Sequence, residues 1–485
     1  MNARRLMLLL LVWLVPATAW ADILFYEVTS KTNSKKKVRF MLQGTATKNP
    51  GRSTTFQHHK FGKIYFDSRE IEVKSVPTLE QSFTKMVAKA GKDADPLMAA
   101  ANWALRHGLL PQFYQAIDKT LAANPNHPRA TLVRELKKQM DKPVADSPKL
   151  EQEMKKLVGR PGMKVKQSNH FILLHDTPDK PAANRKLPRA EERLQLLESV
   201  YESFLLRFYA HGVELDVPNE RLKVVLFNDH RDYLQFATRL SPSLVSTGGF
   251  WDGTNNTSVF FDQGTTEDFK ELVALSDRLQ ADKAEAQRQK KSGIGEQVRL
   301  ADTISLLVDI ARENEDIKVV SHEATHQMAG NTGLFPRDVL VPSWVHEGLA
   351  SYFETSDGAS WGGVGAVNGD RLDYYRALSR DREHSNIDFI VGDQIFSFAE
   401  THGEKLHGYG QAWALTHFMM ERHFPEFIKF YRQLGEMPPD LKLSSEILTA
   451  LFQECVPIDT FALDAQWRNY MNSLQTDLDI ILGEK

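Results

Sequence analysis

Two histidines of this 485-residue sequence, His322 and His326, are close enough together to share one metal ion, and Glu323 stands between them in the pattern His-Glu-x-x-His. On a helix, residues four apart lie one turn apart on the same face, so both imidazoles can bind a single Zn²⁺ ion. Glu323 follows the first histidine, where its carboxylate can take a proton from a water molecule on the metal. The pattern therefore predicts a hydrolytic zinc centre with Glu323 as general base.

The residues around this pattern favour a helix from residue 317 to residue 330. Apolar side chains recur at helical spacing, and Gly330 followed by Asn331 is typical of a helix end. The apolar positions are Ile317, Val320, Ala324 and Met328. The alternative is that both histidines are ordinary residues of a helix, because so short a motif also occurs by chance.

A catalytic zinc site needs a third protein ligand and leaves its fourth position open for water. Residues 342–354, Pro-Ser-Trp-Val-His-Glu-Gly-Leu-Ala-Ser-Tyr-Phe-Glu, contain a candidate in Glu347. We expect a second helix here with Ser343 as its N-cap, which puts Glu347 in the first two turns. The connecting loop is long enough to bring this helix back beside the first.

Together the two segments resemble the gluzincin metallopeptidases, most of all a bacterial, peptidase-MA-like branch. The likeness rests on His-Glu-x-x-His and on Pro-x-Trp-x-x-Glu-Gly-x-Ala-x-Tyr-Phe, which begins at Pro342. It is specific over residues 317–354, diffuse over residues 165–480, and does not extend to the N-terminal part. The resemblance implies a zincin-like fold, hydrolysis of peptide bonds, and Glu347 as the third zinc ligand.

One position departs from the family pattern. Many gluzincins carry an acidic residue four positions after the ligand glutamate, where it orients a histidine, and here that position is Ser351. Metal-bound histidines need such a partner for their second ring nitrogen. Glu354 is the candidate that could serve instead.

The resemblance also implies a helical C-terminal lobe with a Tyr-x-x-Ala-Trp-like helix, which here begins at Tyr409. A phenol or imidazole opposite the metal would stabilise the oxyanion that forms when water attacks a carbonyl. Tyr409 is the first candidate for this role, and plain packing is its alternative. His402, His407 and His417 are the rivals in the same region.

The chain is expected to have an α+β fold, with a small β-rich domain, a helical segment and a zincin-like domain. Residues 22–90 contain short alternating runs typical of strands, and residues 91–160 resemble a tetratricopeptide-like helical hairpin. Within the latter, residues 91–140 could bind a protein partner or act as a structural spacer. Residues 161–485 form the expected metallopeptidase domain, a mixed-sheet upper lobe followed by a helical lower lobe.

An edge strand and an inserted helical hairpin are the two features of this last domain that bear on substrate binding. Residues 190–209 read as a long helix, residues 222–227 as a buried strand, and residues 247–262 as a strand pair. The resemblance implies that the last strand, Ser258 to Phe261, is the edge that pairs with a substrate backbone. Residues 266–312 read as an inserted helical hairpin before the metal-binding helix, a candidate cleft wall or lid.

Residues 1–21 are expected to be a signal peptide. Arg4 and Arg5 precede an apolar run, and Ala19-Trp20-Ala21 is a small-x-small cleavage site. The run is too short to span a bilayer, and no cysteine follows the cleavage site. We therefore expect export to the periplasm or the medium, without a membrane anchor after cleavage.

Composition narrows the function further. The formal net charge of −3 is no signature of nucleic-acid binding, and the single Cys455 cannot form an internal disulfide. The expected function is an exported zinc peptidase that acts on a peptide or protein substrate. The alternatives are a non-catalytic scaffold that keeps the zincin fold, and a metal-dependent amidase that acts on cell-wall peptides.

Overall fold

The computed structural model describes residues 21–29, 37–182, 185–398, 401–476, 479–480 and 483. The expected signal peptide therefore lies outside the described residues, apart from Ala21. The chain divides into two compact units, one formed by Met1–His59 and Lys63–Gln81, the other by Lys60–Gly62 and Ser82–Lys485. Helices and sheets are both abundant, so the α+β class is confirmed.

The first unit is a five-stranded antiparallel sheet in the order β4-β3-β2-β1-β5. Its strands are β1 (Ala21–Thr29), β2 (Lys37–Lys48), β3 (Ser53–Gln57), β4 (Lys63–Asp67) and β5 (Ile71–Val76). Alternate side chains are buried: in β4, Ile64 and Phe66 are buried while Tyr65 is 54% exposed. This period of two is what one apolar face of a sheet requires.

The strands end at Val76, earlier than the expected boundary at residue 90, and helix α1 (Leu79–Ala90) follows. Thr78 and Gln81 form a capping box: each side chain accepts a hydrogen bond from the other residue's backbone N–H, at 3.1 Å in both cases. The Thr-x-x-Gln spacing was a readable helix signal that the strand assignment overlooked.

The second unit begins with a run of helices. After α1 come α2 (Ala94–Arg106), α3 (Leu110–Ala123), α4 (Pro128–Met140) and α5 (Pro148–Val158). Small residues on α2, such as Ala100 and Ala104, are fully buried against the neighbouring helices. The segment 91–160 is helical as expected, but it contains four helices rather than one hairpin.

The second unit contains a mixed five-stranded sheet in the order β6-β7-β8-β10-β9. Its strands are β6 (Lys164–Gln167), β7 (Phe171–His175), β8 (Leu222–Phe227), β9 (Gly249–Asp252) and β10 (Thr257–Phe261). β7, β8 and β10 are parallel, and the outer strands β6 and β9 run antiparallel to their neighbours.

Both faces of this sheet are covered, which explains the continuous apolar run of β8. Val224 and Leu226 pack with helices α6 (Arg189–Tyr209) and α9 (Gly295–Asn331), whereas Val225 and Phe227 pack with α5 and α7 (His230–Leu240). The predicted edge strand is wrong: Ser258 to Phe261 lie in β10, inside the sheet, and β9 is the edge. A hairpin shows which strands pair but not which of them ends the sheet.

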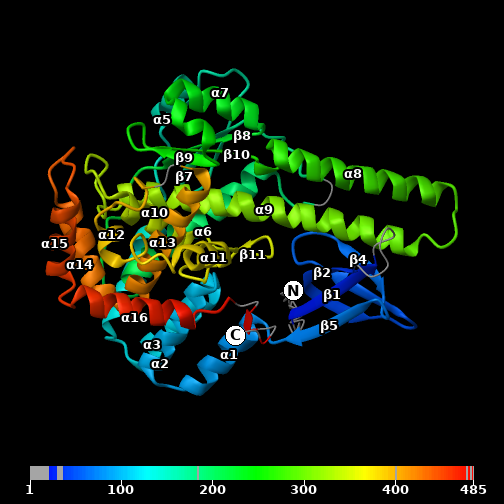
Figure 1. Cartoon of the computed structure of the whole chain (residues 1–485), viewed down its shortest axis with the longest axis horizontal. Coiled ribbons are helices and arrows are strands. Elements are labelled where there is room, and N and C mark those ends of the chain that lie inside the picture. Colours follow the sequence, from blue (N-terminus) through cyan, green and yellow to red (C-terminus); the bar gives the residue numbers. More distant parts are fainter. Residues whose placement is uncertain are drawn as a thin grey trace, which may run out of the picture. The chain divides into compact units, whose positions relative to one another are not determined.

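The helix that carries His322 and His326 is longer than expected. α9 runs without interruption from Gly295 to Asn331 and lies beside α8 (Glu267–Arg288), so the helix of His322 and His326 is itself the second arm of the expected hairpin (Figure 1). The expected hairpin ends at residue 312 and the expected helix begins at residue 317, with charged residues at this junction. The structure shows why they do not break the helix, since two of them, Glu313 and Asp316, are buried and paired.

Arginines of α6 are partners of both carboxylates, and Lys60 and Arg185 also donate to Glu313, each at 2.8 Å. The guanidinium of Arg193 donates to both oxygens of Glu313 at 2.9 Å and to Asp316 at 3.2 Å, and Arg189 lies 2.9 and 2.7 Å from the same two carboxylates. Burial alone would raise the pKa of Glu313, but Arg193 and Arg189 hold it far below its ordinary value. Buried ion pairs thus join α6 to α9 ahead of the histidines.

The C-terminal part of the second unit is helical. Short 3₁₀ helices η1 (Pro242–Ser246) and η2 (Gln263–Thr265) precede it, and a two-stranded ribbon, β11 (Ser356–Asp357) and β12 (Ser360–Trp361), follows α10. The helices are α10 (Ser343–Phe353), α11 (Gly369–Leu378), α12 (Ile387–Val391), α13 (His402–Arg422), α14 (Phe424–Gly435), α15 (Ser445–Cys455) and α16 (Thr460–Ser473). Buried aromatic residues such as Trp344, Trp413 and Trp467 hold them together.

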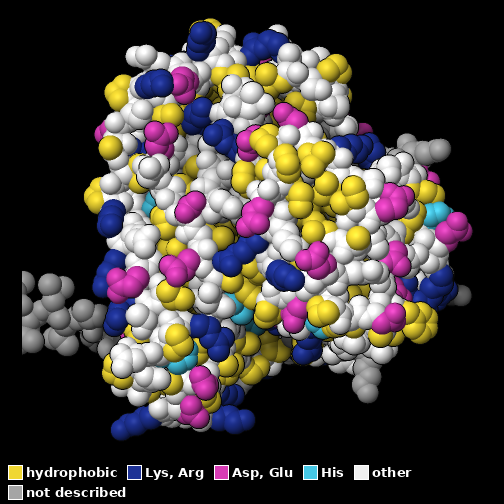
Figure 2. All heavy atoms as spheres, turned by 90° about the vertical axis from the view of Figure 1, so that its left-hand side faces the viewer, with side chains coloured by type: hydrophobic (Ala, Val, Ile, Leu, Met, Phe, Trp, Pro, Cys, Tyr) yellow, Lys and Arg dark blue, Asp and Glu magenta, His cyan; other side chains and the backbone are white. Residues whose placement is uncertain are grey.

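The charge on one face of the molecule and the hydropathy of the helices are both ordinary for a globular chain. On the face drawn in Figure 2, Lys and Arg side chains are mixed with Asp and Glu side chains, so no broad area of this face has one sign of charge. None of the helices in the described ranges combines the length and apolar character that a membrane crossing requires.

The buried ion pairs lead to a first prediction. Glu313→Gln should lower the free energy of unfolding by about 3–5 kcal/mol, because Arg193 and Arg189 stay buried with one carboxylate fewer. Urea denaturation followed by circular dichroism would measure it. Glu315→Gln, two residues away with a side chain 45% exposed, is the control and should change stability by less than about 0.5 kcal/mol.

The ion pairs of Glu313 also fix the direction in which the free energy of unfolding depends on pH. The folded-state pKa of Glu313 lies below its ordinary value of 4.5. Its stabilising contribution is therefore complete above about pH 5 and is lost as the pH falls. Glu313→Gln should lose stability less steeply than the wild type on acidification. Equal slopes in the two proteins would show that Glu313 is not held as an ion pair.

Candidate metal centre

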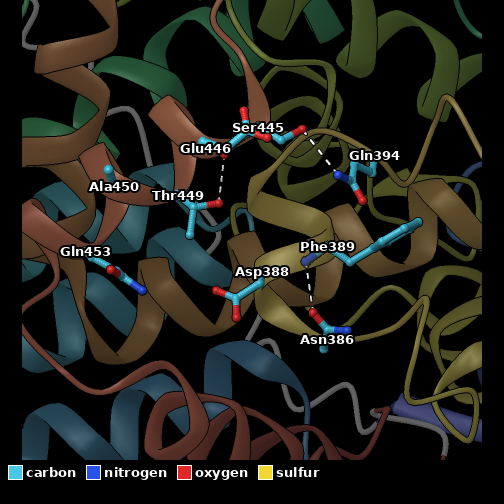
Figure 3. Close-up of a pocket in the computed structure, with 9 residues that line it drawn as sticks. All are labelled: Asn386, Asp388, Phe389, Gln394, Ser445, Glu446, Thr449, Ala450 and Gln453. Carbon is cyan, nitrogen blue, oxygen red and sulfur yellow. Dashed lines mark hydrogen bonds between the residues drawn. The ribbon is translucent and has the colours of Figure 1, made fainter.

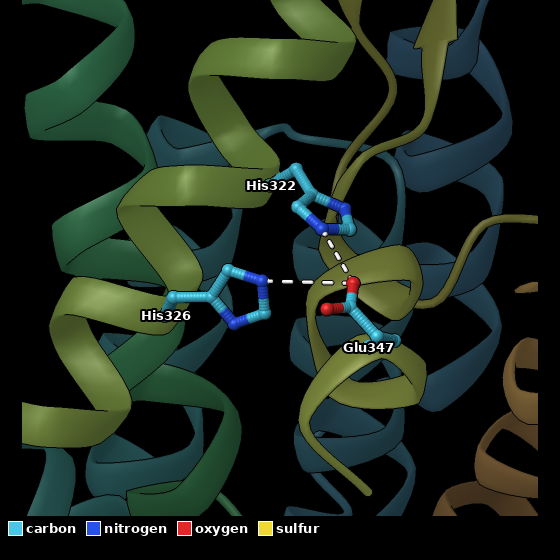
Figure 4. Close-up of side chains that lie close together, drawn as sticks. All are labelled: His322, His326 and Glu347. Carbon is cyan, nitrogen blue, oxygen red and sulfur yellow. Dashed lines mark hydrogen bonds and ion pairs between the residues drawn. The ribbon is translucent and has the colours of Figure 1, made fainter. Parts of the chain in front are cut away.

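Three side chains from two helices converge on one point of the second unit. His322 and His326 lie one turn apart on α9, and Glu347 lies on α10. One oxygen of Glu347 is 3.0 Å from Nε2 of His322 and 3.7 Å from Nε2 of His326 (Figure 4). These three residues offer ligand atoms that all lie within 4.8 Å of one another.

This donor set fits a metal ion. Ligand atoms about 2.0–2.1 Å from a tetrahedral zinc ion are roughly 3.3 Å apart, which is close to the spacing seen here. Two imidazoles and a carboxylate are ligands that zinc accepts, but other divalent transition metals also bind such sets. The geometry therefore supports a site for a metal ion and leaves its element open.

The position of Glu347 depends on how α10 begins. Ser343 is the first residue of the helix and makes no capping hydrogen bond, so its predicted role as N-cap is wrong. The carboxylate of Asp393 instead accepts a hydrogen bond from the Trp344 backbone N–H at 3.0 Å. A residue distant in sequence therefore caps the helix, which no local pattern could indicate.

Close packing of α10 against α13 then sets the height of Glu347. A Cβ atom on Gly348 would lie 2.2 Å from Oγ1 of Thr416 and 2.7 Å from the Ala412 carbonyl oxygen, both on α13. Only glycine allows the two backbones to approach so closely. Trp344, fully buried, packs near Phe427 and Phe430 and anchors the start of the same helix.

The second ring nitrogen of His322 has a carboxylate partner. Nδ1 lies 2.8 Å from Glu354, which also accepts hydrogen bonds from Asn368 at 3.0 Å and from Nε of Arg371 at 2.5 Å. Burial opposes ionisation of Glu354, but Arg371 and His322 outweigh it and lower its pKa to about 2. Glu354 is therefore a charged acceptor that fixes the orientation of the His322 ring.

Ser351, at the position where many gluzincins have the acidic residue, has no part in this contact. It is fully buried, and its hydroxyl has no hydrogen-bond partner in the structure. Glu354, three residues further along the chain, makes the contact that orients His322.

Glu323 lies in the same buried region as the ligands and is 9% exposed. Burial raises its pKa, while the two histidines and a hydrogen bond from the backbone N–H of Trp251 partly lower it again. Trp251 belongs to β9, so the true edge strand of the sheet borders Glu323. A carboxylate with a raised pKa beside candidate metal ligands is suited to accept and return a proton.

Tyr409 lies beside the ligands but within α13 rather than at its start. The centre of its ring is 6.3 Å from the ring of His322, and the guanidinium of Arg371 lies 4.9 Å above its face. The charge of Glu347, followed by burial, raises the pKa of Tyr409, so the phenol keeps its proton. A protonated phenol can donate a hydrogen bond to a developing oxyanion.

The described rivals of Tyr409 are engaged elsewhere. His407 lies 3.3 Å from the carbonyl oxygen of Tyr374, and His417 is buried between the Gly365 carbonyl and the Tyr470 hydroxyl. Burial lowers the pKa of His417 to about 3. The side chain of His402 lies outside the described part of the structure.

Sequence reasoning missed three residues around this cluster. His346 stacks on His326 with ring centres 3.7 Å apart and an interplanar angle of 6°, and burial lowers its pKa to about 3. Trp251 and Arg371 are the other two. His346 adjoins Glu347 and could have been noticed, whereas nothing local distinguishes Trp251 or Arg371, which reach the site only through folding.

Comparison with known proteins adds one finding. Residues 316–440 match a family model whose description is "Protein of unknown function (DUF1570)". The matched segment contains His322, His326, Glu347, Arg371 and Tyr409 but not Trp251. No curated protein and no solved structure matches the chain.

The contact between His322 and Glu354 gives a second prediction. Glu354→Ala should weaken metal binding about 10- to 100-fold, because the His322 ring loses the partner that orients it. Competition with a chromogenic chelator, together with elemental analysis of the purified protein, would measure both the affinity and the identity of the metal.

Ser351→Ala is the matched control on the same helix. It should leave the affinity unchanged, since its hydroxyl has no partner. Equal affinities for the wild type and Glu354→Ala would remove Glu354 from the support of the site.

Proposed function

We propose that this protein is a zinc-dependent peptidase. The observation that carries the proposal is the convergence of His322, His326 and Glu347, with Glu323 buried beside them. A binding protein has no need of a general base at that position. The resemblance of both motifs to the gluzincins supports the same function.

The zincin-like fold is part of this proposal. In support, a mixed sheet packs against α9, and the edge strand β9 lies next to the general base. Within the described residues β9 pairs only with β10, so its other edge can accept an extended peptide backbone. A peptide that binds there as an extended chain would bring a peptide bond next to Glu323, which favours peptides as the substrates.

In the proposed mechanism, His322, His326 and Glu347 would hold a zinc ion. A bound zinc ion supplies a Lewis acid and lowers the pKa of a water ligand towards about 7. Glu323 accepts a proton as water attacks the carbonyl carbon, and then delivers that proton to the leaving amine. Tyr409 would donate a hydrogen bond from its phenolic hydroxyl to the oxygen that gains negative charge.

Location and partners belong to the proposal as well. Cleavage after residue 21 would release the enzyme into the periplasm or the medium, where exported peptides or proteins are its substrates. The helices of residues 91–140 resemble a tetratricopeptide-like unit and are a candidate surface for a protein partner.

The decisive test is Glu323→Gln. The amide keeps the size and hydrogen-bonding capacity of the side chain but cannot accept the proton, so kcat should fall at least about 100-fold. Metal content and thermal stability should stay near those of the wild type. Cleavage of a mixed peptide library, followed by mass spectrometry with and without chelator, measures the activity.

Two results would contradict the proposal. If wild-type protein loaded with zinc cleaves no peptide, hydrolysis of peptides is excluded, and amides from cell-wall peptides become the next substrates to assay. If Glu323→Gln supports the cellular role of the protein while His322→Ala does not, the metal serves a scaffold rather than an enzyme.

Tyr409 gives a separate prediction. Tyr409→Phe should lower kcat about 100- to 1,000-fold with little change in KM, because the hydroxyl is needed only in the transition state. Tyr374→Phe, on the neighbouring helix α11, is the control and should keep wild-type kcat. A Tyr409→Phe enzyme with unchanged kcat would show that the ring only packs against Arg371 and Phe396.

A further inference from the structure

Two of the cavities in the described part of the second unit lie outside the candidate metal centre, and polar groups that line the first are already engaged within the protein. It opens between α12 and α15, lined by residues such as Asn386 and Ser445 (Figure 3). Asn386 accepts a hydrogen bond from the Phe389 backbone N–H at 2.9 Å, and the Ser445 hydroxyl donates to the Gly392 carbonyl at 2.6 Å. These polar groups cap and join helices, so they need no ligand.

The second cavity is of a different kind. Its volume is ≈ 380 Å³, and it lies among α1, α2, α6, α10 and α13. Its walls are largely apolar and include Met86, Trp103, Leu105, Val364, Met420 and Phe424. Cavities of about 300–1,000 Å³ with apolar walls and a few polar groups are typical of small-molecule sites.

The charged groups of this cavity are not balanced. Glu421 accepts hydrogen bonds from Arg106, from the Tyr352 hydroxyl at 2.6 Å and from Arg207 at 3.4 Å. One carboxylate thus serves two guanidinium groups, and no other acidic residue lines the cavity. The cavity therefore has an excess of one positive charge.

Arg207 is the more deeply buried of the two cations. Its side chain is 7% exposed, and its Nη atoms bind the Met420 carbonyl at 2.7 Å and the ring of His211 at 2.6 Å. Its Nε is buried without a hydrogen-bond partner, although a buried donor of this kind normally has one. Burial and the positive charge of Arg207 lower the pKa of His211 to about 3, so this imidazole is neutral.

We propose that this cavity binds a small monoanionic amphiphile, a carboxylate attached to an apolar chain or ring. The carboxylate matches the unbalanced charge and pairs with a guanidinium group, which presents N–H donors in the required geometry. The apolar part fills the space between Trp103, Met420 and Phe424. Arg106, whose side chain is 44% exposed, lies at the open end, and Arg207 lies at the buried end.

The site shares no residue with the metal centre. Its binding can therefore be measured on the full-length mature protein whether or not the protein hydrolyses peptides. Calorimetric titration with sodium octanoate is the direct experiment, with octan-1-ol and octylammonium as probes of equal length and different charge. Octanoate should bind saturably with one molecule per chain, and octylammonium should not bind.

Two charge variants should change the octanoate affinity in opposite directions. Arg106→Gln removes one cation and should weaken binding about 10-fold, whereas Glu421→Gln removes the competing carboxylate and should strengthen it to a similar extent. Arg134→Gln, at an arginine of α4 with a side chain 47% exposed and outside the cavity, is the matched control and should leave the affinity unchanged.

A third variant tests the location without changing any charge. Ala99→Trp places a large ring in the cavity wall at an exposed position of α2 and should abolish binding. The proposal is overturned if octanoate does not saturate one site, if octan-1-ol binds as tightly, or if Arg106→Gln and Ala99→Trp both keep wild-type affinity.

Discussion

The buried ion pairs between α6 and α9 are the constraint on which the metal centre depends. Glu313 and Asp316 precede His322 by less than three helical turns, and their partners Arg189 and Arg193 lie on the helix that packs against the sheet. Buried charges tolerate little displacement, because each one separated from its partner pays a large desolvation cost. The pairs therefore fix both the height and the rotation of α9, and with them the direction of the two imidazoles.

The other half of the centre is positioned by packing rather than by charge. Gly348 lets α10 contact α13 backbone to backbone, and Trp344 is held by aromatic neighbours and by the cap from Asp393. Glu354 then joins the two halves, since it is the residue that follows α10 and its carboxylate contacts His322 on α9. His322 and Glu347 are thus positioned by contacts within the protein itself, which is the preorganisation that a metal site needs.

Charge is handled differently at the two sites of this unit. Around the candidate metal centre, Arg371 is paired with Glu354, whereas Glu347 contacts two imidazoles, so its negative charge is available to a metal cation. In the cavity of Arg106 and Arg207, one carboxylate serves two cations. A buried excess charge is costly unless a binding partner supplies the opposite sign. The candidate metal centre is therefore suited to a cation, whereas the cavity of Arg106 and Arg207 is suited to an anion.

The sequence by itself determined the elements whose signals are local. The four-residue spacing of His322 and His326 brings both onto one helical face in any fold that keeps the helix, and the apolar run 222–227 can only be a buried strand or a buried helix segment. Tertiary structure decided what depends on distant residues. β9 rather than β10 ends the sheet, α9 continues through charges whose partners are Lys60, Arg185 and arginines of α6, and Trp251 and Arg371 reach the site from segments without any motif. Hydrogen bonds and ion pairs between segments far apart in the chain leave no periodic trace in the sequence, because their energy depends on three-dimensional proximity alone.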